Sequence, residues 1–233
     1  MPWRVESSFV RLAALFSGGK DSTYAAYLME QQGHTIDVLV SILPSDPHSW
    51  MFHTPNLHLL PLVSEAMGKK LVTERSSESE QSDLFALTRA LLGLEVDGVV
   101  TGAIASDYQW DRINGACECL GLRTFSPLWR KNQEMLLREI VNCGIKAVIV
   151  GIYAEGMEEG WLGATLDHDS ICRLKELAMT HGINISGEGG EFETLVLDSP
   201  MHAAPIEVLE TNQSRTRDGG SLSILKARLG RRI

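Results

Sequence analysis

Hydrophobic positions in the first half of the chain form short continuous runs, separated by longer segments with helical spacing. The continuous runs predict strands at residues 12–16, 36–43, 70–73 and 96–103. The segments between them predict helices at residues 23–32, 56–68 and 79–92. Few positions in the second of these strands are polar, which is typical of a parallel strand buried on both faces. This alternation predicts an α/β fold with a doubly wound parallel sheet.

The second half of the chain has a different order of elements. Its pattern predicts helices at residues 133–143 and 169–181, strands at 146–153 and 195–198, and a closing β-hairpin of residues 206–210 and 221–225. Residues 123–129 are interpreted as a turn that leads the chain into this second part. We therefore expect two domains, residues 1–122 and a smaller C-terminal α+β domain of residues 123–233.

Composition and charge narrow the classes of function. The chain has 233 residues, of which 44% are hydrophobic and 22% charged, as in an ordinary soluble globular protein. No apolar run reaches the length of a membrane span and the first residues show no signal region, so we expect a cytoplasmic protein without a membrane partner. A net charge of -9 argues against a broad nucleic-acid surface. The four cysteines show no disulfide or zinc pattern, although Cys117 and Cys119 leave redox or metal chemistry open.

The strongest chemical signal is the segment Ser-Gly-Gly-Lys-Asp-Ser at residues 17–22, between an expected strand and an expected helix. Its glycines let the backbone turn tightly, and the free amides of the first helical turn then point at anionic oxygens. Ser17 and Ser22 add hydroxyl donors and Lys20 adds a positive charge, whereas Asp21 either caps the helix or holds magnesium. These residue types also occur in plain turns. Strand, glycines, lysine and helix together favour phosphate binding.

A second region is expected to join this loop. If the strand order reverses between the first and fourth strands, the two are neighbours and a ligand binds beyond their carboxyl ends. Gly102 and the start of the helix that follows then lie near residues 17–22. Tyr108 and Arg112 on that helix face the same cleft, where Arg112 either contacts a phosphate or pairs with Asp107 or Tyr108.

A second motif, Gly-Glu-Gly-Gly-Glu-Phe-Glu-Thr, occupies residues 187–194 and precedes an apolar strand. Its glycines allow close approach of the backbone, beside a phenylalanine that we expect to be buried. A solvated acidic turn explains three carboxylates but not so many glycines. Opposite a phosphate site, the carboxylates of Glu188, Glu191 and Glu193 could hold a metal, accept a proton from an attacking amine or balance a cationic substrate.

The first motif resembles the SGGxDS loop of the PP-loop ATP pyrophosphatases, which have a HUP-like fold and cleave ATP between its α and β phosphates. Together with the second motif it resembles the paired signatures of the diphthine:ammonia ligase family. Three further segments share in this resemblance: Tyr108-Gln109-x-x-Arg112, Pro127-Leu128-Trp129 and Trp161-x-Gly163. The resemblance extends from about residue 11 to residue 205.

The resemblance implies ATP-dependent amidation of diphthine on elongation factor 2 through an acyl-adenylate, with free ammonium as the nitrogen source. ATP and magnesium are the implied cofactors, and a homo-oligomer is left open. The first domain would bind ATP and the second domain the substrate. Two rival functions remain: another PP-loop enzyme that modifies tRNA or a small molecule, and an ATP-binding sensor without catalysis.

The resemblance and the residue chemistry together assign candidate roles. The candidate catalytic residues are Lys20, Asp21, Glu188 and Glu191, with Asp21 as the metal ligand. The candidate ATP-binding residues are Ser17, Gly18, Gly19, Lys20, Asp21, Ser22 and Gly102. The candidate substrate-binding residues are Tyr108, Arg112, Trp161, Glu188, Gly189, Gly190, Glu191, Glu193 and Thr194. The aromatic and polar loop of residues 44–56 is a further candidate, as a lid or a wall of the substrate site.

Overall fold

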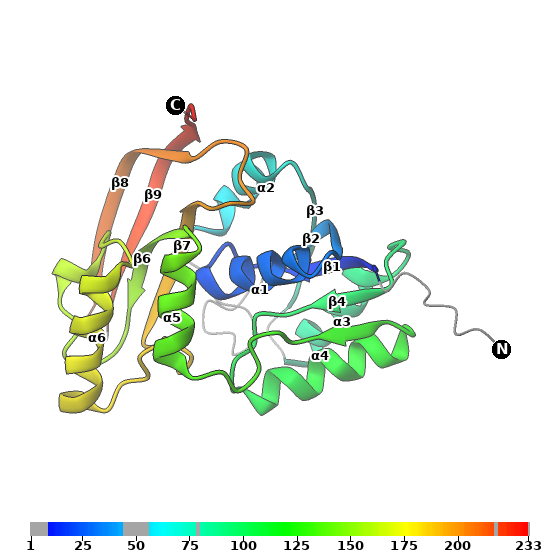
Figure 1. Ribbon diagram of the computed structural model, residues 1–233, viewed down its shortest axis with the longest axis horizontal. Helices are drawn as coiled ribbons and strands as arrows, with labels where there is room; N and C mark the ends of the chain where they lie inside the picture. The colour runs from blue at the N-terminus through cyan, green and yellow to red at the C-terminus, as the bar shows by residue number, and fades with distance from the viewer. Residues whose placement is uncertain (1–8, 44–55, 78–79, 217–218, 233) are drawn as a thin grey trace.

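The computed structural model describes residues 9–43, 56–77, 80–216 and 219–232, and it consists of two sheets with helices packed on them (Figure 1). The first sheet has five parallel strands in the order β3-β2-β1-β4-β5. Its strands are β1 (Arg11–Leu15), β2 (Thr35–Leu43), β3 (Lys70–Arg75), β4 (Gly98–Val100) and β5 (Arg123–Phe125). The expected doubly wound α/β sheet is confirmed.

Helices cover both faces of this sheet. They are α1 (Lys20–Gln31), the 3-10 turn η1 (Leu57–Leu59), α2 (Leu60–Met67), α3 (Glu80–Leu91) and α4 (Asp107–Cys119). Buried side chains of α1 and α2 form one core cluster with Leu12 and Leu39 of the sheet, whereas those of α3 and α4 form another with Ala13 and Val40. The alternation of strand residues between two cores explains why these strands are apolar at almost every position. No helix in the described ranges is long and apolar enough to cross a membrane.

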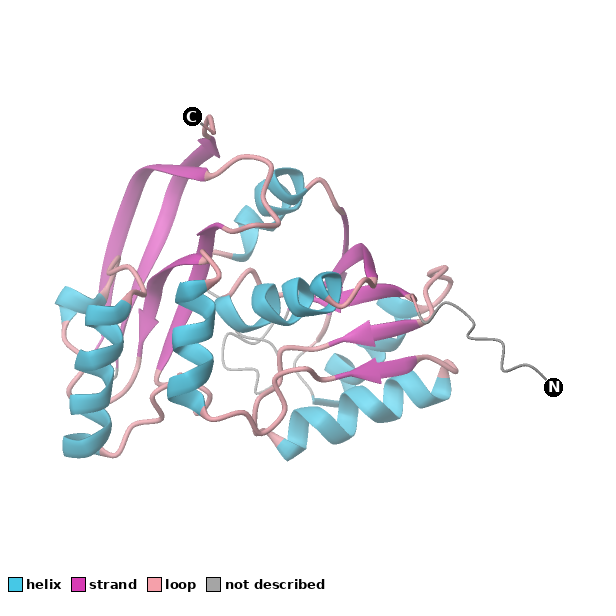
Figure 2. Ribbon diagram, viewed as in Figure 1, coloured by secondary structure: helices cyan, strands magenta, loops and turns pink. Residues whose placement is uncertain are grey.

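The second sheet has four antiparallel strands in the order β7-β6-β9-β8. Its elements are α5 (Gln133–Asn142), β6 (Lys146–Ile152), the 3-10 turn η2 (Glu159–Trp161), α6 (His168–His181), β7 (Phe192–Asp198), β8 (Ile206–Thr216) and β9 (Gly219–Leu229). Helices α5 and α6 lie side by side against this sheet (Figure 2). The expected C-terminal α+β part is confirmed.

Two segments differ from the sequence prediction. Residues 123–125 form a strand, β5, instead of a turn, and this strand pairs with β4 beyond the expected boundary at residue 122. Three residues are too few to show a hydrophobic period, so only the pairing partner defines this strand. The closing hairpin is longer than expected, with 11 residues in each strand. Its outer part carries polar side chains and is held by backbone pairing, so the hydrophobic pattern does not reveal it.

The two sheets share a core instead of meeting across a solvated gap. One cluster of buried side chains runs from Leu12 and Tyr24 in the first sheet layer to Leu195 and Val196 on β7. The backbones also bond directly, because the amide of Val196 donates to the carbonyl of Gly18 at 2.8 Å. Helix α1 lies beside β7 in the ribbon (Figure 1). The loop before α1 is therefore built by both sheets.

Asn56 joins the sheets at a second place. Its side-chain amide donates to the carbonyl of Leu222 at 2.9 Å, and its side-chain oxygen accepts from the amide of Ile224 at 2.7 Å. The residue is buried and has a positive φ of 74°, a conformation that Asn tolerates better than most residues. This one side chain thus satisfies two backbone groups of β9.

Asn56→Ala should lower the free energy of unfolding by about 2 to 4 kcal/mol, because it leaves two buried backbone groups unpaired. Denaturant unfolding followed by circular dichroism measures this change. Asn212→Ala is the matched control, since Asn212 is exposed on β8 and should change stability by less than about 0.5 kcal/mol. Equal stability of the two variants would show that Asn56 does not join the sheets.

Candidate functional site

The loop between β1 and α1 has the geometry of an anion site. Gly18 adopts a positive φ of 79°, which favours glycine, and Gly19 precedes the first residue of α1. Gly19 has no side chain with which to cap the helix. The first turn of α1, from Lys20 to Ser22, lines a cavity. A helix N-terminus that faces a cavity attracts negative charge through its amides and its dipole.

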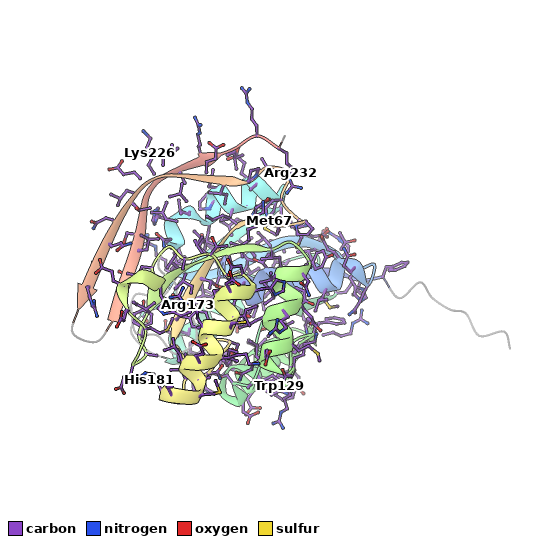
Figure 3. All side chains as sticks on the ribbon, turned by 60° about the vertical axis from the view of Figure 1, so that its left-hand side comes forward. Met67, Trp129, Arg173, His181, Lys226 and Arg232 are labelled. Carbon is purple, nitrogen blue, oxygen red and sulfur yellow. The ribbon has the colours of Figure 1, made fainter. Side chains whose placement is uncertain are left out.

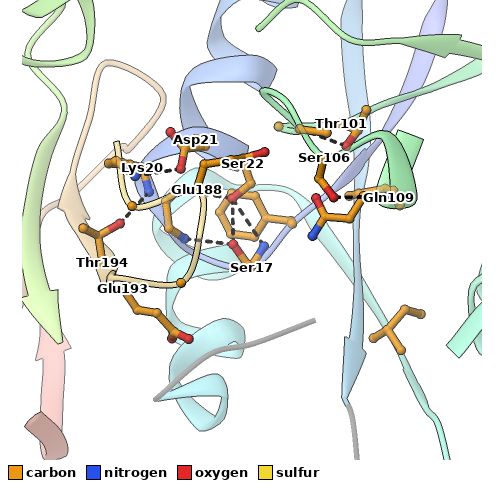
Figure 4. Close-up of a pocket in the computed structure, with 18 of the residues that line it drawn as sticks. Ser17, Lys20, Asp21, Ser22, Thr101, Ser106, Gln109, Glu188, Glu193 and Thr194 are labelled. Atoms are coloured by element: carbon orange, nitrogen blue, oxygen red, sulfur yellow. Dashed lines mark hydrogen bonds and ion pairs between the residues drawn. The ribbon is translucent and has the colours of Figure 1, made fainter. Parts of the chain in front are cut away.

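Two serine hydroxyls hold this loop in shape. The Oγ of Ser22 accepts from the amide of Ser17 at 3.3 Å and donates to the carbonyl of Gly19 at 3.1 Å. The Oγ of Ser17 lies 3.2 Å from that of Ser22 and accepts from the amide of Gly19 at 3.3 Å. Both serines line the cavity (Figure 4). Their hydroxyls therefore fix the backbone of the loop and remain next to any ligand.

Lys20 is almost fully buried, with 3% of its surface exposed. Its Nζ donates to the Oδ2 of Asp21 at 2.8 Å and to the carbonyl of Ser186 at 2.6 Å. Its backbone amide donates to the Oγ1 of Thr194 at 3.1 Å. The second motif and the residue before it thus bind both the side chain and the backbone of Lys20. The structure brings the two motifs together around this lysine.

Gly102 lets the loop after β4 approach the same place. A Cβ atom added at Gly102 would lie 2.8 Å from the carbonyl carbon of Asp21 and 2.8 Å from the amide nitrogen of Ser22. No side chain fits between these backbones. The expected adjacency of the first and fourth strands is confirmed by the pairing of Leu12 with Gly98. Gly102 lines the cavity next to the loop of residues 17–22.

Glu188 connects the second motif to the loop after β4. Its Oε1 accepts from the amide of Ile104 at 3.1 Å and from the amide of Ala105 at 3.0 Å. Burial raises the pKa of this carboxyl, and the two amides oppose that rise because they stabilise the charged form. Glu188 also lines the cavity. Its carboxylate fixes the position of residues 103–106 relative to the second sheet.

Glu191 does not line the cavity, in contrast to the sequence prediction of a catalytic carboxylate. Its two oxygens accept from the amides of Asn184 at 2.8 Å and Gly189 at 2.9 Å. Both acceptor atoms therefore serve the turn to which Glu191 belongs. The physical reason is the tightness of this turn, whose amides point inward and require an acceptor. The geometry gives Glu191 a structural position behind the site.

Glu193 is the carboxylate of the second motif that projects into the cavity. Its Oε2 is buried and has no hydrogen-bond partner among the residues that the structure describes. Burial raises the pKa of Glu193 to about 7, and the positive charge of Lys20 opposes this rise. In Figure 4 the side chain extends away from the pair of Lys20 and Asp21. Glu193 is thus a cavity carboxylate that titrates near neutral pH.

The cavity has a volume of about 640 Å³ and two kinds of wall. This volume suits a nucleotide-sized ligand. The polar wall comes from the two motifs and from Thr101, Ser106 and Gln109. The apolar wall is formed by side chains at the ends of β1 and β2 and on η1 and α4, namely Leu15, Val40, Ile42, Leu57 and Ile113. A ligand with a flat apolar ring would fit the apolar wall with that ring and the polar wall with its charged groups.

Sequence reasoning missed the residues that complete these walls. Thr101 directly precedes Gly102, whereas Ser106 caps α4 by accepting from the amide of Gln109 at 3.3 Å. The polarity of Thr101 at the end of a buried strand was an available signal. The apolar wall gave no such signal, because Val40 and Ile42 look like ordinary residues of a buried strand. Their exposure to a cavity is decided only by the three-dimensional arrangement.

Besides Glu191, four predicted site residues lie outside the cavity lining, namely Gly18, Tyr108, Arg112 and Trp161. The guanidinium carbon of Arg112 lies 3.4 Å from the ring centroid of Tyr108, so these two residues of α4 stack on each other. Trp161 is 4% exposed and belongs to the core cluster, and its ring centroid lies 4.0 Å from the guanidinium carbon of Arg173. Arg173 lies on α6 (Figure 3). Gly18 is absent from the lining and determines the turn of the loop through its positive φ. Residues 44–55 of the predicted lid at 44–56 lie outside the described residues.

Asp21 has a buried oxygen, Oδ1, without a hydrogen-bond partner in the described part of the chain. A single carboxylate oxygen beside an anion site fits magnesium, which commonly binds one or two carboxylates and completes its shell with water and phosphate oxygens. Within the described ranges no group of three or more His, Cys, Asp or Glu side chains could hold a metal ion. The donor set therefore fits a metal that arrives with a phosphate ligand.

Comparisons with known proteins agree on one family. A family model described as the diphthamide synthase N-terminal domain matches residues 10–124, and a model of the diphthamide synthase C-terminal domain matches residues 132–229. The chain is 36% identical to the diphthine–ammonia ligase of Rattus norvegicus over 228 residues, which covers 88% of this chain and 85% of that protein. The Homo sapiens protein of the same name is 36% identical over 222 residues, covering 85% and 83%.

Among solved structures, the chain has a weak likeness to a predicted subunit of tRNA methyltransferase from Methanocaldococcus jannaschii. The superposition covers 82% of this chain and 100% of that chain, with a TM-score of 0.42 and 14% identity.

Gly102→Ala should destabilise the protein by about 1 to 3 kcal/mol, because the new methyl group clashes with the backbone at the start of α1. Gly115→Ala is the matched control on α4, where an added Cβ meets nothing within 4 Å. That substitution should raise stability by about 0.5 to 1 kcal/mol through helix propensity. Opposite signs in denaturant unfolding support the close approach at Gly102, and a stabilising Gly102→Ala would contradict it.

Glu193→Gln should become more stable relative to the wild type as pH rises. The folded protein holds the Glu193 proton up to a pKa of about 7, whereas the unfolded chain releases it near the ordinary value of 4.5. The wild type therefore loses stability between these two pH values, and glutamine does not titrate. The difference in unfolding free energy should grow by about 2 to 3 kcal/mol between pH 4 and pH 8. A difference independent of pH would show that Glu193 has an ordinary pKa.

Proposed function

The chain belongs to the diphthamide synthase family, and we propose that it uses ATP to join ammonium to the carboxylate of diphthine on elongation factor 2. The observation that carries this proposal is the meeting of the two signature motifs around Lys20. The buried ammonium of Lys20 bonds Asp21 in the first motif and the carbonyl of Ser186 just before the second. An ATP site and an acceptor site would then share one cavity.

ATP is expected to bind with its phosphates at residues 17–22 and its base against the apolar wall. The amides at the start of α1 and the hydroxyls of Ser17 and Ser22 suit the phosphate oxygens. Val40 and Ile42 suit the flat face of adenine. We propose that the first sheet forms the ATP-binding domain, extended past residue 122 to include β5. The second sheet, which supplies residues 187–194, forms the substrate-binding domain.

Asp21 is proposed to hold magnesium through its unpartnered Oδ1. When bound with ATP, the ion would neutralise negative charge on the phosphates. Lys20 supports the same charge from the protein side, since its Nζ is fixed by two hydrogen bonds and loses little freedom when a ligand arrives. Thr194 positions Lys20 by accepting from its backbone amide.

The proposed reaction has two steps in this cavity. A carboxylate oxygen of diphthine attacks the α-phosphorus of ATP, and the bond to the departing diphosphate breaks. The nitrogen of ammonia then attacks the carbonyl carbon of the acyl-adenylate, and AMP leaves with the electron pair of the broken carbon–oxygen bond. The amides of residues 17–22 and the charge of Lys20 stabilise the growing negative charge in the first step.

The remaining predicted residues receive supporting roles in this proposal. Glu188 holds the loop of residues 103–106 against the second motif, while Gly189 and Gly190 keep the cavity wall free of side chains. Tyr108 and Arg112 stack beside the cavity on α4, where they would contact only the outer part of a large substrate. Trp161 supports the core of the second domain. We place the reaction in the cytoplasm, where the elongation factor acts.

The test is release of AMP and diphosphate from ATP in the presence of ammonium, with and without elongation factor 2 that carries diphthine. The proposal expects release that depends on the factor and accompanies amide formation. Release without dependence on the factor would point to another acceptor. Absence of release under all conditions would favour an ATP-binding sensor.

Lys20→Gln should lower this release by about 100-fold to 1000-fold, because it removes the positive charge that faces the phosphates. Lys70→Gln, which changes an exposed lysine on β3, is the control and should leave the rate unchanged. Thermal unfolding of both variants separates lost chemistry from lost folding. A folded Lys20→Gln variant with the wild-type rate would exclude this role of Lys20.

A further inference from the structure

The three carboxylates of the second motif have different surroundings. Glu188 is bonded to two amides of the loop after β4, and Glu191 is bonded to two amides of its own turn. Glu193 lines the cavity and keeps a buried oxygen, Oε2, without a partner among the described residues. A buried carboxylate oxygen without a donor is unfavourable, so a residue of this kind is explained best by a ligand that supplies the donor.

The chemistry of the possible ligands selects one of them. The phosphates of ATP are anionic and would be repelled by the Glu193 carboxylate. The trimethylammonium group of diphthine is cationic, but it has no N–H group to donate to Oε2. An ammonium ion is small, cationic and carries four N–H donors. It alone among the substrates of the proposed reaction satisfies both the charge and the missing hydrogen bond of Glu193.

We propose that Glu193 binds the ammonium ion and accepts a proton from it, so that neutral ammonia forms next to the acyl-adenylate. This inference rests on the proposed function, because it assigns the nitrogen site within the same cavity. Glu193 lies on β7 next to Thr194, which bonds the amide of Lys20. The proposed ammonium site is therefore one residue along β7 from Thr194, the residue that contacts the loop of residues 17–22.

The charged and titratable groups around Glu193 agree with this role. Lys20 on α1 is the cation whose field reaches Glu193, and its Nζ is already bonded to Asp21 and Ser186. Tyr153, which follows β6, feels the negative charge of Glu193, and burial together with this charge raises the pKa of Tyr153 to about 12. Tyr153 therefore stays neutral and does not compete for the ammonium proton.

A carboxylate with a pKa of about 7 is a stronger base than an exposed carboxylate. At neutral pH a large fraction of the molecules still have Glu193 in its ionised form.

The proton balance of the step is complete. Ammonium gives one proton to the Oε2 of Glu193 and becomes ammonia, whose lone pair forms the bond to the carbonyl carbon. The bond between that carbon and the phosphate oxygen breaks, and AMP takes its electron pair. The new C–N group loses a second proton to solvent, which leaves the amide. Glu193 returns its own proton to solvent before the next cycle.

The experiment compares two nucleophiles in the wild type and in Glu193→Gln. Ammonium must lose a proton before it attacks, whereas hydroxylamine is mostly neutral at pH 7 and attacks directly to give a hydroxamate. Both are supplied with ATP, magnesium and diphthine-bearing elongation factor 2. Exchange of labelled diphosphate into ATP, measured without any nucleophile, reports the adenylation half-reaction separately and shows that the variant is folded.

Glu193→Gln is expected to reduce amide formation from ammonium by about 100-fold or more, as for loss of a general base. Hydroxamate formation and diphosphate exchange should stay within about threefold of the wild type. Glu74→Gln, which changes a surface carboxylate paired with Arg89, should alter none of the three rates. Glu193→Asp, which keeps the charge but moves it back, should restore part of the ammonium reaction.

Two results would overturn the inference. If hydroxamate formation falls as far as amide formation, Glu193 does not act on the ammonium proton. If diphosphate exchange falls in parallel with amide formation, Glu193 serves adenylation or binding of diphthine instead. A wild-type enzyme without factor-dependent exchange would be a different failure, because it would refute the proposed function itself.

Discussion

The structure depends on the pairing of one buried cation. Lys20 has almost no contact with solvent, and an ammonium group removed from water needs both an opposite charge and hydrogen-bond acceptors. Asp21 supplies the charge from the same helix, whereas Ser186 supplies an acceptor from the other sheet. The loop of residues 17–22 is therefore not complete within the first sheet and its helices. Its central side chain is in place only when the second sheet is docked.

Close approach of backbones reinforces this dependence. The contact of Gly102 with Asp21 and Ser22 leaves no room for a side chain, and the amide of Val196 bonds the carbonyl of Gly18. Glu188 adds a third connection by accepting two amides of the loop after β4. Three segments that are far apart in the sequence thus fix one cavity wall. These contacts preorganise the wall, and preorganised donors are a requirement for electrostatic stabilisation of a transition state.

The three glutamates of the second motif differ in their hydrogen-bond partners. Glu188 bridges two loops, Glu191 satisfies the amides of its own turn, and Glu193 keeps an oxygen for the cavity. Their side chains are chemically the same, and they lie within six positions of one another. The difference comes from which amides each carboxylate can reach. The pKa of Glu193 rises to about 7 because burial is not balanced by such amides.

The sequence by itself determined the fold class, the neighbouring first and fourth strands, the family and the two motifs of the site. These features depend on local signals: continuous apolar runs, helical spacing, and glycines next to Lys20 or among the carboxylates. The tertiary structure alone decided that β5 joins the first sheet, that Val40 and Ile42 face a cavity, and that Trp161 is a core residue. It also separated Glu193 from Glu191. The physical reason is that exposure to a cavity and the partner of a polar atom are properties of residues distant in the chain, which no local pattern records.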